Sequence, residues 1–102
     1  MSAYKDRQLF KRDCDKLKGK GYNVKLVTSK VLDDYAGMNH HAAKDMHFPL
    51  SKCRKHEILI RRDLPPKTKR KTLKHEVFEI DVMKKNGNKY IPAHKKAMRR
   101  VG

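Results

Sequence analysis

The residues best suited to chemistry lie within the segment 73–83, LKHEVFEIDVM. It contains the imidazole of His75 and the carboxylates of Glu76 and Glu79. On a helix that turns by about 100° per residue, all three side chains fall inside the wide arc that also holds the apolar residues. A buried carboxylate must be paired, hydrogen-bonded, protonated or bound to metal, because an isolated buried charge costs several kcal/mol. The segment is therefore either a paired polar core or a functional site.

A metal site is one interpretation of this pattern. His75 and Glu79 are four residues apart, so one helical face can present a nitrogen and an oxygen to the same ion. His94 is the best third ligand, because a short Asn-Gly turn at 86–87 would fold the next helix back toward this one. Such a set would hold one divalent ion, preferably zinc, and leave a position open for water. Glu76 would then be available as a general base.

Two interpretations without metal stay open. In the first, Lys or Arg neutralises Glu76 and Glu79 in a satisfied polar core, and the chain is a structural or adaptor protein. In the second, the segment forms the floor of an exposed groove, in which His75, Glu76 and Glu79 act as general acids or bases.

The run from HEILIRRDL through TLKHEVFE, followed by a helix with one more ligand, resembles the minimal core of the zincin metallopeptidases. In that family a strand precedes a helix bearing His-Glu-x-x-His, and a later residue completes the zinc site. The resemblance covers residues 56–97 and implies a zincin-like metal-dependent hydrolase.

The resemblance also implies roles for individual residues. His75 matches the first zinc ligand and Glu76 the general base. Glu79 stands where the family has its second histidine, and His94 stands where many such families have an acidic ligand. The ligand types are exchanged, but their number is kept.

Lysine and arginine dominate the composition. The 102 residues include 27 Lys and Arg against 11 Asp and Glu, which gives a formal net charge of +16. Such a field attracts polyanions, and nucleic acid is the commonest polyanion inside a cell. The leading interpretation is a small basic protein that associates with DNA or RNA through phosphates.

Two groups of basic residues are the predicted nucleic-acid contacts. The first surrounds the start of the helix predicted at 66–85, where a bound phosphate would offset the repulsion between cations and the helix dipole. The second lies in the last predicted helix. Aromatic residues are too sparse to indicate a base-stacking platform. The two groups are Arg61, Arg62, Lys67, Lys69, Arg70 and Lys71, and Lys95, Lys96, Arg99 and Arg100.

Periodicity predicts an α+β fold in a single domain, 1–102, with about four helices and a short sheet of at least two strands. Glycines at 19 and 21 end the first helix, and Pro66 suits the first turn of the third. The predicted helices are 3–18, 29–37, 66–85 and 91–100, and the predicted strands are 22–28 and 56–64.

The segment 38–55 shows no clear period, and we expect it to be an irregular loop region. Its polar residues His40, His41, Asp45 and His47 could supply metal ligands or remain solvated.

The cysteines and the apolar content indicate where in the cell the protein is expected to lie. Cys14 and Cys53 lie far apart and match no metal or disulfide pattern, so both are expected to be reduced thiols. No stretch approaches the roughly 18 apolar residues of a membrane-spanning helix, and the first residues lack the apolar run of a signal peptide. We therefore expect a soluble, intracellular protein, cytoplasmic or nucleoid-associated, without membrane insertion.

Overall fold

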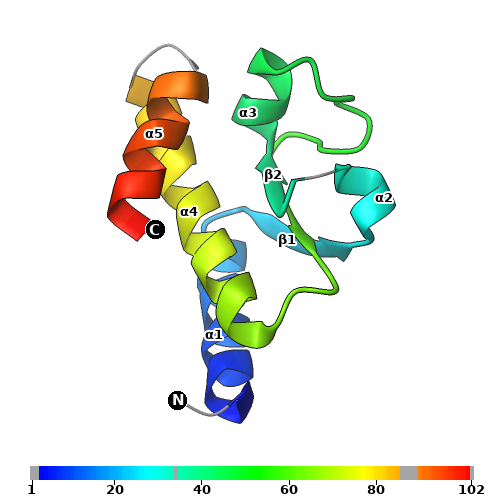
Figure 1. The fold of residues 1–102 in the computed structure, drawn as a ribbon, viewed down its shortest axis with the longest axis vertical. Coiled ribbons are helices and arrows are strands. Elements are labelled where there is room, and N and C mark those ends of the chain that lie inside the picture. Colours follow the sequence, from blue (N-terminus) through cyan, green and yellow to red (C-terminus); the bar gives the residue numbers. More distant parts are fainter. Residues whose placement is uncertain (1–2, 34, 86–89, 102) are drawn as a thin grey trace.

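The computed structural model describes residues 3–33, 35–85 and 90–101. Within them, five helices and three strands confirm the α+β class (Figure 1). In chain order the elements are α1 (Ala3–Gly19), β1 (Asn23–Val27), α2 (Ser29–Leu32), β2 (Gly37–Asn39), α3 (His40–Asp45), β3 (Glu57–Arg61), α4 (Pro66–Lys85) and α5 (Tyr90–Val101).

The helix boundaries follow from local sequence. Beyond the end of α1, Gly21 has a φ of +90°, and its N–H donates to the carbonyl of Lys18 at 3.0 Å. Glycine adopts this left-handed conformation without a steric penalty, which explains the stop. The helix α4 begins at Pro66, because a proline in the first turn removes no internal hydrogen bond.

The sheet has the order β1-β3-β2. The strand β1 is parallel to β3, with Val24 opposite Ile58, and β2 is antiparallel to β3. In β3 three consecutive residues, Ile58, Leu59 and Ile60, are fully buried. Both faces of the central strand are therefore covered, and β2 is an edge strand.

The long helix α4 organises the core. It packs against α1, α5 and the sheet, and Figure 1 shows α2 across the strands from α4, with α3 at the end of β2, where it contacts α4 and α5. On one face of β3, Ile58 and Ile60 join Leu73 and Ile80 of α4. On the other face, Leu59 joins Met83. Because α4 is packed on several sides, its polar residues in the apolar arc must find partners inside the protein.

The segment 38–55 is more regular than we predicted. It contains most of β2 and all of α3, so the prediction of an irregular loop was wrong for its first part. A three-residue strand and a six-residue helix are too short for periodicity to reveal. Conversely, α2 ends at Leu32 rather than near Gly37. The predicted turn at 86–87 lies outside the described residues.

None of the described helices combines the length and the apolar character that crossing a membrane requires.

Candidate metal centre

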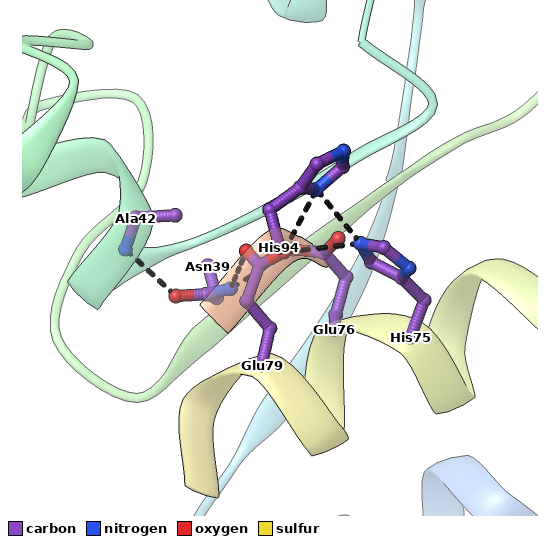
Figure 2. Close-up of polar contacts among 6 residues, drawn as sticks. All are labelled: Asn39, Ala42, His75, Glu76, Glu79 and His94. Carbon is purple, nitrogen blue, oxygen red and sulfur yellow. Dashed lines mark hydrogen bonds and ion pairs between the residues drawn. The ribbon is translucent and has the colours of Figure 1, made fainter. Parts of the chain in front are cut away.

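His75, Glu79 and His94 meet at one point between α4 and α5 (Figure 2). Nε2 of His75 lies 3.0 Å from Oε2 of Glu79 and 3.2 Å from Nδ1 of His94. The distance from Nδ1 of His94 to Oε2 of Glu79 is also 3.2 Å. Three potential ligand atoms thus form a nearly equilateral triangle. In the part of the chain that the structure describes, this is the only group of three or more His, Cys, Asp or Glu residues that could hold a metal ion.

The triangle has the size of a coordination face. Bonds of about 2.0–2.1 Å that meet at octahedral or tetrahedral angles separate neighbouring ligand atoms by roughly 2.8–3.4 Å. The three observed separations of 3.0–3.2 Å fall within that range. One ion above the plane of the triangle could therefore contact all three atoms without moving them.

Helix geometry brings these residues together as predicted. His75 and Glu79 are one turn apart on α4, and α5 places His94 against them. The side chain of Glu79 is 1% exposed, whereas those of His75 and His94 are 14% and 39% exposed. The site is therefore closed beneath Glu79 and open on the side of His94, where a water molecule or a substrate could enter.

Asn39 is a central residue that the sequence analysis missed. Its side chain is buried at the end of β2, and its amide Nδ2 donates to Oε1 of Glu76 at 3.0 Å and to Oε1 of Glu79 at 3.1 Å. Its Oδ1 accepts from the N–H of Ala42 at 2.9 Å and so caps α3. Asn39 thereby fixes the carboxylate that offers Oε2 to the two histidines, as outer-shell residues of metal sites do.

Glu76 is a buried carboxyl group next to the triangle. Burial, and then the nearby charge of Glu79, raise the pKa of Glu76 well above its ordinary value, although the hydrogen bond from Asn39 opposes this shift. Raised carboxyl pKa values are typical of groups that exchange protons near neutral pH.

A pocket of about 410 Å³ adjoins the triangle. His75, Glu76 and His94 form part of its wall, so the two histidine rings and the buried carboxyl group border the same space. The rest of the wall comes from α4, α5 and the chain before and within β2: Tyr35, Ala36, Gly37, Thr68, Lys71, Thr72 and Met98. A larger hollow of about 610 Å³ lies between α1 and α4, but it contains none of the three triangle residues.

The structure does not bring the other histidines into a metal site. His40 places Nδ1 3.0 Å from the carbonyl oxygen of Cys53, and its ring packs edge-on against His41. His47 is exposed. Among the described residues, neither these histidines nor Asp45 joins a group with three potential ligands.

The polar core interpretation required cationic partners for the two glutamates. Among the described residues, the partners of Glu79 are Asn39 and the two histidines, and the hydrogen bond found for Glu76 comes from Asn39. No lysine or arginine of that part of the chain forms an ion pair with either carboxylate. The groups that contact Oε2 of Glu79 are therefore two histidines, and not the lysine or arginine that this interpretation expected.

Two of the predicted nucleic-acid contacts are engaged within the protein. Arg70 of α4 pairs at 3.1 Å with the buried carboxylate of Asp6 in α1, and Arg61 pairs at 2.8 Å with Asp63. Lys69 is half-buried, and the side chain of Arg100 lies outside the described residues. The remaining predicted contacts are exposed: Arg62, Lys67, Lys71, Lys95, Lys96 and Arg99.

Both cysteines are free. Burial and the charges of neighbouring aspartates raise the pKa of Cys14 to about 11. Burial and the charge of Glu57 raise the pKa of Cys53 to about 12. Both groups are thus protonated thiols at neutral pH, which makes them poor nucleophiles and poor metal ligands.

Comparisons with known proteins identified no relative: no family model, no curated protein and no solved structure matched the chain.

Proposed function

We propose that this protein is a metal-dependent hydrolase that holds one zinc ion with His75, Glu79 and His94. The observation that carries the proposal is the triangle of ligand atoms, with sides of 3.0–3.2 Å, from two helices. Two neutral imidazoles and one carboxylate are a ligand set for a catalytic zinc, because they leave a position for water.

A zinc ion held by these residues would lower the pKa of a coordinated water molecule and so supply a nucleophile at neutral pH. The surrounding residues provide the remaining functions. Oε2 of Glu79 and one nitrogen of each histidine hold the ion, while Asn39 fixes the other oxygen of Glu79. Glu76 accepts the proton of the attacking water and then transfers it to the leaving group.

The environment of Glu76 suits this proton transfer. In the metal-free protein burial, and after it the charge of Glu79, raise the pKa of Glu76. A divalent cation bound beside Glu79 would offset that charge and so favour the ionised form of Glu76, which is the form that acts as a base. The ligand set also suits iron(II); we favour hydrolysis because the buried carboxyl group of Glu76 borders the same pocket and hydrolysis needs a general base.

Amide bonds are the proposed substrate bonds. This choice rests on the resemblance of residues 56–97 to the zincin core, in which the residue after the first ligand is the general base. It is supported by the open side of the site, where His94 borders a pocket large enough for a substrate residue.

The test is cleavage of a complex peptide mixture by the zinc-loaded protein, with new termini read by mass spectrometry. We expect chelator-sensitive cleavage that Glu76→Gln reduces at least a hundredfold while the zinc content stays unchanged, since that variant loses the base and keeps the ligands. Cleavage that is absent from the zinc-loaded protein, or equal in the variant, would overturn the proposal.

A further inference from the structure

The pocket beside the triangle contains one cationic side chain with a permanent charge, that of Lys71. Lys71 is exposed, and none of the described carboxylates forms an ion pair with it. Its neighbour Arg70, by contrast, is paired with Asp6 at 3.1 Å. Lys71 is thus free to meet a charge brought by a ligand.

Hydroxyl-bearing residues accompany this lysine. Thr68 and Thr72 are one turn apart on α4, and both belong to the same wall of the pocket as Lys71. A carboxylate that enters a partly desolvated pocket gains most from an ammonium group and additional hydrogen-bond donors. A lysine side chain in the same place would meet a like charge without a compensating acid, because the pocket's one acidic residue, Glu76, is already bonded to Asn39.

Exposed apolar surface at the pocket favours a chain-like ligand. Tyr35 is 39% exposed and Met98 is 50% exposed, and both border this space. They come from different parts of the chain: Tyr35 lies in the segment between α2 and β2, and Met98 lies on α5. A peptide bound between them would bury their apolar surface, which is favourable.

We propose that the substrate is an acidic peptide segment, and that Lys71 determines specificity by binding an Asp or Glu side chain next to the bond held at the metal. This proposal rests on the proposed function. The formal charge of +16 attracts such segments over long distances. A nucleic acid is the less favoured ligand of this pocket, because Lys71 is the one lysine or arginine among its described wall residues and nucleic acid is bound through several phosphate contacts.

The experiment compares two probes that bind metal in the same way, the hydroxamates of acetyl-aspartate and acetyl-lysine. Their dissociation constants are measured with zinc-loaded wild type, Lys71→Glu and Lys74→Glu. Lys74 is the matched control, because it is also exposed on α4 and, like Lys71, borders the larger hollow, but it does not border this pocket. We expect wild type and Lys74→Glu to bind the aspartyl probe about tenfold more tightly, and Lys71→Glu to reverse the order.

Equal affinities of wild type for the two probes, or equal effects of the two substitutions, would overturn the assignment of Lys71. Displacement of the aspartyl probe by a short oligonucleotide in wild type but not in Lys71→Glu would also overturn it, in favour of a nucleic-acid ligand. The zinc content of each sample separates the two proposals. Protein that takes up no zinc contradicts both, whereas zinc-loaded protein without discrimination contradicts this one alone.

Discussion

Glu79 divides its contacts between its two carboxylate oxygens. Oε1 accepts from the amide of Asn39, and Oε2 faces both His75 and His94. One oxygen is therefore held by the protein and the other is presented with the histidines. The same contacts could arise without metal if both histidines donated an N–H to Oε2. Stoichiometric metal binding distinguishes these two states of the site.

Glu76 gives a prediction for the metal-free protein. Its raised pKa means that the folded state retains a proton that the unfolded state releases. The stabilisation from that proton is complete below the ordinary pKa of glutamate and is lost as the pH rises through the raised pKa. Glu76→Gln stays neutral at every pH, so it should raise the melting temperature by several degrees at pH 8 and by much less at pH 4. About 1 kcal/mol corresponds to roughly 4–8 °C in a domain of this size.

Glu57→Gln is the matched control for this measurement. A hydrogen bond from Lys25 is the largest cause that lowers the pKa of Glu57, so ionised Glu57 stabilises the fold. That stabilisation is present above the ordinary pKa and is lost as the pH falls through the lowered value. Glu57→Gln should therefore lower the melting temperature at pH 8. Equal effects of Glu76→Gln at both pH values would contradict the buried, protonated state of Glu76.

The grouping of His75, Glu79 and His94 could be predicted from the sequence, but the hydrogen bonds from Asn39 that hold the neighbouring carboxylates could not. Helical spacing places His75 and Glu79 on one face, and a turn before the next helix directs His94 toward them. Asn39 is 37 and 40 positions from its partners Glu76 and Glu79, and it reaches them through the pairing of β2 with β3. Periodicity describes neighbours along one element and carries no information about such a contact.

At the scale of elements, the approach of α4 to β2 depends on Gly37. A Cβ added at this position would lie 2.8 Å from the side chain of Thr72, 3.1 Å from the carbonyl oxygen of Leu59 and 3.2 Å from Cγ of Glu76. Gly37→Ala should therefore push β2 away from α4 and destabilise the protein by about 1–3 kcal/mol, as overpacking does. Because β2 ends at Asn39, zinc affinity should fall as well. Chemical denaturation and zinc titration check the two effects.

Gly19→Ala is the control for this change. A Cβ at Gly19, the last residue of α1, would have no atom within 4 Å. We expect the stability of that variant to be within about 0.5 kcal/mol of wild type, as for most surface substitutions. If Gly37→Ala were equally harmless, the close packing of β2 on α4 would not contribute to the site.

The elements themselves were predictable to different degrees. The prediction of a helix at 66–85 matches α4, because a proline start and a long apolar arc specify it. The edge strand β2 has three residues, and its position is determined by β3 rather than by its own composition. The helix that bears two of the ligands could therefore be predicted from the sequence, whereas the short strand that packs against it could not.

At the scale of the whole molecule, association with nucleic acid stays a prediction. Phosphate contacts release counterions, so the logarithm of the affinity should fall linearly with the logarithm of the salt concentration. Arg62→Gln with Lys67→Gln, two exposed residues of the first predicted group, should reduce that slope by about 2, at roughly 0.9 per phosphate contact. Fluorescence anisotropy with a labelled DNA duplex measures the slope. Substitution of the exposed Lys30 and Lys44, on other elements, is the control. Absent or salt-independent binding would contradict the prediction.

The binding of one zinc ion between α4 and α5 is tested most directly by two measurements on purified protein. The first is elemental analysis, and the second is the melting temperature before and after chelation. We predict about one zinc ion per chain and a lower melting temperature after chelation. Glu79→Gln and His94→Ala should lose the metal. His56→Ala should keep it, because His56 is an exposed histidine outside the triangle. Stoichiometric iron in place of zinc would contradict the hydrolase. No stoichiometric metal, with a melting temperature that chelation leaves unchanged and Glu79→Gln lowers, would show instead a hydrogen-bonded polar core in a structural or adaptor protein.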